Sequence, residues 1–102
     1  MQTLPININH AQLDALCRHH GIIELSLFGS VLRDDFRPDS DIDVLITFEP
    51  GKTLTLDSYT DISEELSTLF DARNVDLVES RRLTDPYRRH EILRTRETIY
   101  VR

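Results

Sequence analysis

The segment LFGSVLRDDFRPDSDIDVLITF, residues 27–48, places a Gly-Ser step, an arginine and two aspartates between two apolar runs. The first run completes a strand predicted over residues 22–28, whose alternation gives one apolar face formed by Ile23, Leu25 and Leu27. The last run forms a second strand over residues 41–48, closed by the turn signal Pro50-Gly51. The polar residues between them are either a solvated turn or a functional site.

Helix and strand signals alternate along the rest of the chain. Asn9, three residues before Gln12, resembles a capping box that opens a helix, and Gly21 is its expected stop. One or two helical turns are expected just after Gly29-Ser30. Three further elements are predicted, namely an amphipathic helix over residues 57–70, a strand over residues 74–80 and a helix from Asp85-Pro86 to about Thr95.

The terminal stretch TIYVR is β-prone and completes the pattern as a possible edge strand. The order of elements predicts an α/β (α+β) fold, a small mixed sheet of three to four strands with helices packed on it. With 102 residues, the chain is expected to form a single domain over residues 1–102.

Composition excludes several classes of protein. Hydrophobic residues make up 39% and charged residues 29%, as in an ordinary folded domain. No apolar run approaches the roughly 20 residues of a membrane span, and the N-terminus has no signal-peptide core, so a cytoplasmic protein without membrane contact is expected. The single cysteine, Cys17, follows Leu13 and Leu16 on an apolar stripe and is predicted to be a core residue.

Charge is distributed unevenly along the chain. The net charge of −6 argues against a protein that binds nucleic acid strongly through phosphate attraction. Residues 1–80 contain 5 Lys and Arg against 15 Asp and Glu, whereas residues 81–102 contain 7 Arg against 3 acids. This arginine-rich segment is either a solvated helix face or a surface for phosphate or an acidic partner.

Two carboxylates begin the second predicted strand. Asp41 and Asp43 are two residues apart, so they project from one face about 6.6 Å apart along the chain. Paired carboxylates repel unless a cation lies between them, and oxygen ligands of this kind suit Mg²⁺ or Mn²⁺. Asp76, in the third predicted strand, supplies a third carboxylate if the two strands are neighbours. The alternative is that all three acids face water, with Asp76 on an edge strand.

The Gly29-Ser30 step follows a strand and opens a short helix. Free backbone N–H groups at such a position suit a phosphate group, and a serine hydroxyl can donate to a phosphate oxygen. Most Gly-Ser steps are only turns, so this signal has meaning only together with the carboxylates.

The residues GSVLRDDFRPDSDIDV resemble the G-S-x-x-R…S-D-x-D signature of the DNA polymerase β-like nucleotidyltransferases, and in particular the stand-alone minimal nucleotidyltransferase (MNT) proteins. The resemblance covers nearly the whole chain. It implies that Asp41 and Asp43 bind metal ions, and that Asp76 is a third ligand or the base. It also implies that Gly29 and Ser30 hold the phosphates of ATP, and it gives supporting roles to Arg33 and Ser40.

Two residues depart from the family pattern. Family members often have arginine where this chain has Val31, and glycine where it has Asp34. The first difference is expected to remove a phosphate contact, and the second adds an acid near the expected site. Neither removes the metal ligands.

The resemblance implies two-metal transfer of AMP from ATP, with two Mg²⁺ ions as cofactors. MNT proteins are commonly antitoxins whose partner is a HEPN-domain ribonuclease toxin, and some adenylylate a tyrosine of that toxin. This chain is therefore expected to adenylylate a HEPN partner, because it has no evident segment for a second, acceptor-binding domain. Two alternatives remain, namely an antitoxin that acts by binding alone and a nucleotidyltransferase for a small molecule or an RNA end.

Overall fold

The computed structural model describes residues 7–32 and 40–102. Along the chain the elements are α1 (His10–His20), β1 (Ile22–Phe28), η1 (Gly29–Leu32), β2 (Ile42–Phe48), α2 (Leu56–Leu69), β3 (Val75–Glu79), η2 (Ser80–Arg82), α3 (Pro86–Thr95) and β4 (Glu97–Val101). The predicted alternation of helices and strands is confirmed, and the short helix after β1 begins at Gly29 as a 3-10 turn. No helix in the described ranges is long and apolar enough to cross a membrane.

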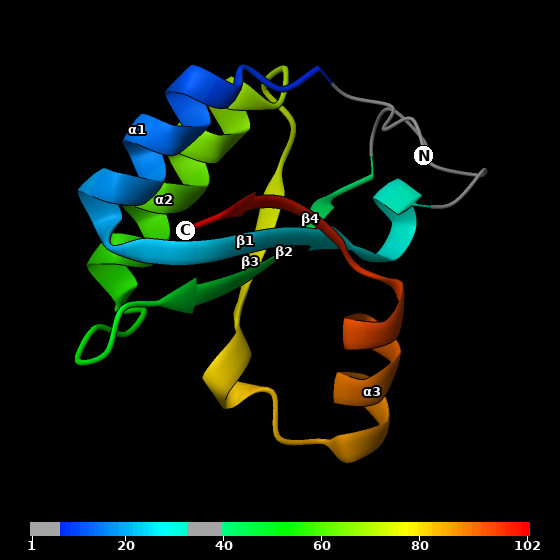
Figure 1. Ribbon diagram of the computed structural model, residues 1–102. Coiled ribbons are helices and arrows are strands. Elements are labelled where there is room, and N and C mark those ends of the chain that lie inside the picture. The colour runs from blue at the N-terminus through cyan, green and yellow to red at the C-terminus, as the bar shows by residue number, and fades with distance from the viewer. Residues whose placement is uncertain (1–6, 33–39) are drawn as a thin grey trace.

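The four strands form one mixed sheet in the order β3-β2-β1-β4. Strand β1 is antiparallel to both β2 and β4, whereas β2 and β3 are parallel and are joined through α2. Helices α1 and α2 pack together on one face of the sheet, and α3 lies on the other (Figure 1). The predicted mixed α/β architecture is therefore confirmed, and both β3 and β4 are edge strands.

Local sequence signals explain where the helices begin and end. The Asn9 side chain accepts a hydrogen bond from the backbone N–H of Gln12 at 3.0 Å, which satisfies a donor that the first turn leaves unpaired. Gly21 ends α1 in the left-handed conformation, with φ 71°. Asp85 caps α3 by accepting from the N–H groups of Tyr87 and Arg88.

The sheet has an apolar core on each face. The larger core lies under α1 and α2 and includes Phe70, Ile62 and Leu66, and the smaller one, under α3, consists of Phe28, Leu45, Leu83 and Ile92. One predicted core residue is wrong. Ile23 is only half-buried and Ile22 is in the core, because the pairing of β1 with β2 shifts register between Ile22 and Glu24.

Cys17 is a core residue, as predicted. Its side chain is fully buried between the α1 stripe and the sheet. Burial, reinforced by the nearby Asp14 carboxylate, raises the pKa of the Cys17 thiol to about 12. A thiol that stays protonated at neutral pH is a poor nucleophile, so Cys17 has a packing role.

A buried carboxylate fixes the chain between β2 and α2. Glu79, at the end of β3, is 3% exposed and lies on the α1/α2 side of the sheet. Its Oε1 accepts from the Thr53 hydroxyl at 2.8 Å and from the Leu54 N–H at 3.0 Å. These bonds satisfy the backbone of a loop that would otherwise have a buried, unpaired donor.

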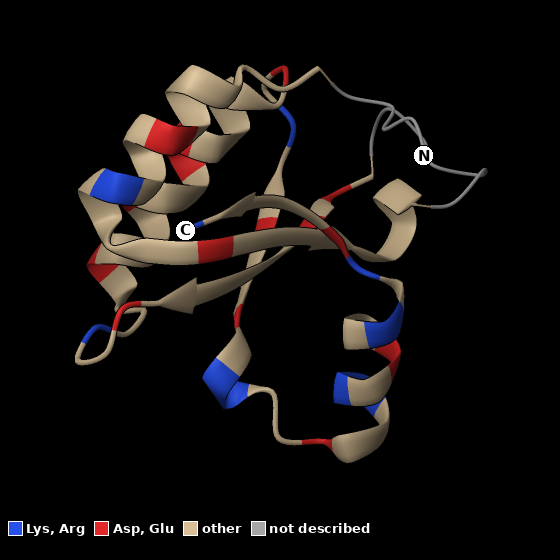
Figure 2. Ribbon diagram, viewed as in Figure 1, with Lys and Arg blue, Asp and Glu red and all other residues tan. Residues whose placement is uncertain are grey.

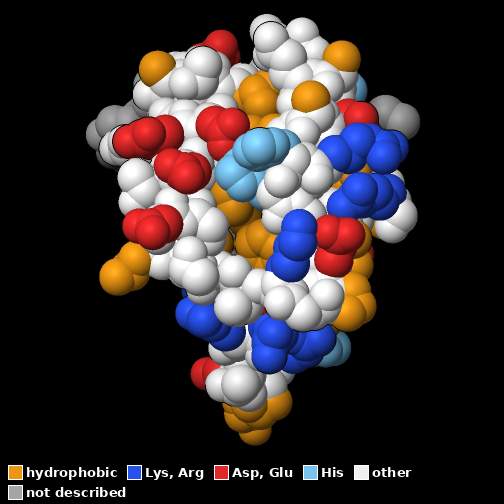
Figure 3. All heavy atoms as spheres, turned by 90° about the vertical axis from the view of Figure 1, so that its left-hand side faces the viewer, with side chains coloured by type: hydrophobic (Ala, Val, Ile, Leu, Met, Phe, Trp, Pro, Cys, Tyr) orange, Lys and Arg blue, Asp and Glu red, His pale blue; other side chains and the backbone are white. Residues whose placement is uncertain are grey.

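The charge separation predicted from the sequence is visible in space. Lysine and arginine residues are concentrated on η2 and α3, whereas acidic residues dominate the helices and strands above them (Figure 2). On the face seen from the left of Figure 1, acidic side chains gather at one side and basic side chains at the other side and below (Figure 3).

Candidate functional site

The parallel pairing of β2 with β3 brings two predicted site residues side by side. Asp43 and Asp76 are partners in the strand register. Their neighbours Ile42, Val44 and Leu77 are in the core under α1 and α2. Because side chains alternate along a strand, both aspartates project from the opposite face, the one that carries α3. The predicted three-carboxylate site requires these two strands to be neighbours.

Asp41 lies just before β2 and is exposed. One residue separates it from Asp43, but Asp41 lies before the strand, where it lines a hollow together with Ser63, Ser67 and Asn74. The Ser30 hydroxyl donates to the backbone carbonyl of Asp41 at 3.4 Å, a long and therefore weak hydrogen bond. Ser40 is half-buried in the bend that leads into Asp41. The Gly-Ser turn and the backbone of Asp41 therefore lie next to each other.

Gly29 is packed directly against Asp43. Phe28, the last residue of β1, pairs with Asp43 in the strand register, and Gly29 then turns the chain with φ 75°. A Cβ atom at position 29 would lie 2.3 Å from Oδ2 of Asp43, closer than any side chain can approach. Glycine is required here both for the left-handed backbone and for the space that the carboxylate occupies.

Tyr59 contacts a residue of the candidate site, and nothing in the sequence indicated this contact. Its spacing from Ile62 and Leu66 is that of an apolar stripe on α2, and its ring does pack against the larger core. Its hydroxyl, however, reaches the edge of the sheet, where it donates to Oδ1 of Asp76 at 3.2 Å and accepts from the Leu77 N–H at 3.4 Å. A tyrosine on an amphipathic stripe gives no signal of this contact without the strand order.

The alternative placement of Asp76, as an exposed residue on an edge strand, is confirmed. β3 is an edge strand and Asp76 is exposed, as that interpretation required. Its carboxylate is nevertheless oriented by Tyr59 rather than left to solvent alone.

The remaining positions discussed from the sequence are Val31, Arg33 and Asp34. Arg33 and Asp34 lie outside the described residues. Val31, where the family often has arginine, is 1% exposed and belongs to the larger core. In this chain position 31 therefore packs the 3-10 turn onto the sheet, and it could not contact a phosphate.

The donor set suits a hard divalent cation. Asp43 and Asp76 present carboxylate oxygens from paired strand positions, and Asp41 precedes Asp43 by two positions along the chain. Across residues 7–32 and 40–102, no three acidic, histidine or cysteine side chains are already gathered around one point. Asp43 and Asp76 could supply two oxygens of a Mg²⁺ site, and a bound phosphate and water would then supply the others, as is common for Mg²⁺.

The mixed sheet, with carboxylates on two paired strands and a glycine turn against one of them, defines the nucleotidyltransferase fold. The family model of the nucleotidyltransferase domain matches residues 11–99. The chain therefore belongs to the nucleotidyltransferase domain family.

Two individual proteins are similar to this chain over most of their length. The chain is 33% identical over 81 residues to the protein adenylyltransferase MntA of Thermococcus cleftensis, covering 79% of this chain and 76% of that protein. It is 37% identical to a solved structure that carries the name minimal nucleotidyltransferase, with a TM-score of 0.67 over 90% of this chain and 88% of that one.

A third similar structure is that of a protein complex. It contains an MNT antitoxin with the tri-AMPylated HEPN toxin of Shewanella oneidensis, and the match has a TM-score of 0.61 at 19% identity over 91% of this chain and 70% of that chain. At this identity the likeness establishes the fold.

Proposed function

We propose that the protein is an antitoxin that transfers AMP from ATP to a tyrosine hydroxyl of a HEPN-domain ribonuclease toxin and thereby inactivates it. The observation that carries this proposal is the pairing of Asp43 with Asp76 beside the close contact between Gly29 and Asp43. It is supported by the likeness to the MntA protein adenylyltransferase and to the MNT antitoxin bound to an AMPylated toxin.

Each residue of the candidate site has a role in this proposal. Asp41 and Asp43 bind two Mg²⁺ ions, which would lower the charge penalty of phosphoryl transfer. Asp76 is a third ligand or the base. The backbone of Gly29 and the hydroxyl of Ser30 hold the β- and γ-phosphates, and Ser40 supports the turn before Asp41.

The reaction is an in-line displacement at the α-phosphorus of ATP. The acceptor oxygen forms a bond to this phosphorus, the bond to the β-phosphate oxygen breaks, and pyrophosphate leaves. In the version with Asp76 as the base, the acceptor's proton passes to its carboxylate, whose other oxygen is hydrogen-bonded to Tyr59. The protein's main contribution is to position the triphosphate against the acceptor.

The test mixes the protein with ATP labelled on the α-phosphate, Mg²⁺ and a HEPN ribonuclease encoded next to it. We expect label on a tyrosine of the ribonuclease, located by mass spectrometry, together with loss of its RNA cleavage. Label on a small molecule or an RNA end, with an unmodified and active ribonuclease, would contradict the proposal.

The same reagents separate catalysis from binding. Asp41→Asn/Asp43→Asn is expected to bind the ribonuclease without protecting cells from it. Protection by this double variant at equal expression would favour an antitoxin that acts by binding alone.

Tyr59→Phe is expected to reduce the kcat of AMP transfer about 3- to 10-fold, the contribution of one long, solvent-exposed hydrogen bond. The variant keeps the ring in the core and removes only the hydroxyl that holds Asp76. Because the change does not touch the triphosphate, the KM for ATP should stay the same. Steady-state kinetics at saturating partner concentration measures both constants.

The matched control is Tyr100→Phe. The Tyr100 hydroxyl is buried, and within the described part of the chain no hydrogen-bond partner lies within reach of it. Its removal should leave kcat unchanged. Equal kcat values for Tyr59→Phe and Tyr100→Phe would show that the Tyr59 hydroxyl does not position the reacting carboxylate.

A further inference from the structure

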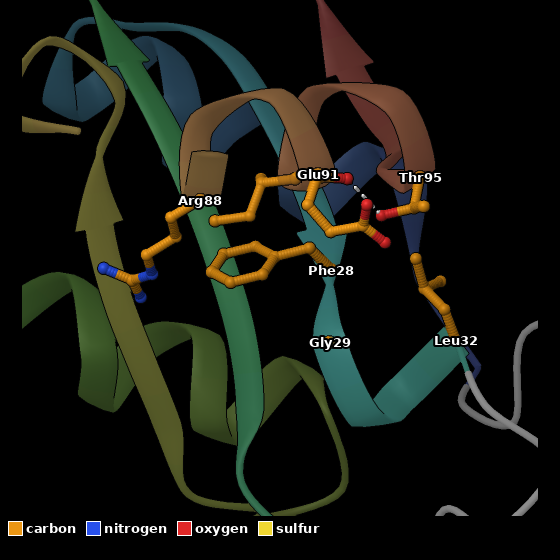
Figure 4. A pocket seen from close by; sticks show the side chains of 7 residues that line it. Phe28, Gly29, Leu32, Arg88, Glu91 and Thr95 are labelled. Carbon is orange, nitrogen blue, oxygen red and sulfur yellow. Dashed lines mark hydrogen bonds between the residues drawn. The ribbon is translucent and has the colours of Figure 1, made fainter. Parts of the chain in front are cut away.

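A cleft on the α3 face opens next to the carboxylates. It has a volume of about 620 Å³ and lies between α3 and the chain that leaves β1 (Figure 4). Its lining residues are Phe28, Gly29, Leu32, Arg88, Glu91, Ile92 and Thr95. Gly29 belongs to both sites, because it lines this cleft and also packs against Asp43. A ligand that begins at the carboxylates could therefore continue into the cleft.

The lining is apolar at its base and polar at its rim. Phe28 and Ile92, each 6% exposed, form part of the smaller core and present an aromatic and an aliphatic surface. Glu91, Arg88 and Thr95 are exposed on α3 above them. An apolar floor with a few polar groups around it is the usual lining of a site for a flat, heteroaromatic ligand.

Most arginines near the C-terminus are already engaged by the protein. Each of the following has an ion pair or a carbonyl acceptor for its side chain: Arg81, Arg82, Arg89, Arg94, Arg96 and Arg102. These contacts favour the interpretation of most of the segment as a solvated, internally paired surface.

Arg88 is the exception among the described arginines of this segment. Its backbone N–H bonds to Asp85, but no acceptor within the described ranges lies in reach of its guanidinium group. Figure 4 shows this side chain extending from α3 on the side of the cleft where β2 and β3 lie, whereas Glu91 and Thr95 are on the side of Leu32. A guanidinium without a protein anion, at a cleft that borders two carboxylate-bearing strands, suits a phosphate group.

We propose that this cleft binds the nucleoside part of the ATP substrate, with the base against Phe28 and Ile92 and the Arg88 guanidinium on a phosphate oxygen. The assignment rests on the proposed function and adds α3 to the nucleotide site. In this assignment α3 forms one side of the base-binding site, and Arg88 is a substrate-binding residue.

The test measures direct binding of the non-hydrolysable analogue AMP-PNP to the whole protein in Mg²⁺ by isothermal titration calorimetry. Arg88→Ala is expected to raise the Kd about 10- to 100-fold, as loss of a charge-assisted hydrogen bond should. Arg89→Ala removes the same charge from the next residue, which is outside the cleft and bonds to the Ser80 carbonyl at 3.0 Å. This control should bind as the wild type does.

A second pair of variants tests the place of the base. Thr95→Phe fills the rim of the cleft and should weaken AMP-PNP at least about tenfold, but leave inorganic tripolyphosphate binding unchanged. Thr84→Phe, also at an exposed threonine, should affect neither ligand. If the wild type binds AMP-PNP and all four variants match it, the cleft assignment is overturned and the proposed function stands. If the wild type binds neither ligand, both are overturned.

Discussion

Asp43→Asn is expected to lower the rate of AMP transfer by at least about 1,000-fold, because in the proposed reaction Asp43 binds the cation and the amide would lose the charge that does so. Asp43 is the central carboxylate of the candidate site, since it pairs with Asp76 across the parallel strands and contacts Gly29. The substitution is nearly isosteric, so the packing around Gly29 should be preserved. Transfer of α-phosphate label to the partner, followed over time, measures the loss.

The stability of the same variant separates a chemical role from a structural one. Wild type should gain melting temperature when Mg²⁺ and ATP are added, and the variant should gain much less. Asp61→Asn, at an exposed position of α2, is the control for lost charge. Transfer by Asp43→Asn within tenfold of the wild type would remove Asp43 from the site.

The sequence predicted features that depend on residues close together in the chain better than features that depend on contacts between distant elements. Asn9 and Gly21 set the ends of α1 through hydrogen bonds to residues a few positions away, so the local sequence is sufficient to predict where this helix begins and ends. The meeting of Asp43 and Asp76 was predicted only on the condition that their strands are neighbours. Which strands pair is decided by the packing of α2 and the core, and the sheet order supplies that condition.

Contacts between distant elements were missed for the same reason. Tyr59 has the spacing of a core residue, and its second role depends on the position of α2 at the β3 edge, which brings its hydroxyl to Asp76. Glu79 looks like an ordinary strand-end acid, yet the loop before α2 folds back and buries it. The register shift that places Ile22 rather than Ile23 in the core leaves no mark on the alternation of residues.

Gly29→Ala is expected to lower AMP transfer about 100-fold, the effect of displacing a reacting group by roughly 1 Å. The added methyl group would lie 2.3 Å from Oδ2 of Asp43, and the carboxylate end of a side chain moves more easily than the backbone of β1. Asp43 would therefore rotate away from its position beside Asp76. The same label-transfer assay measures the loss, and chemical denaturation measures the cost in stability.

Gly51 provides a control in which only the clash is absent. Its φ of 88° is as unfavourable for alanine as the 75° of Gly29, but nothing lies within 4 Å of a Cβ built there. Both alanine variants should lose about 1–2 kcal/mol of stability from the left-handed backbone. Only Gly29→Ala should lose activity, because only there does the methyl group meet a carboxylate of the site. If the two variants lose activity equally, the effect comes from backbone strain alone, and the close approach of Gly29 to Asp43 has no part in transfer.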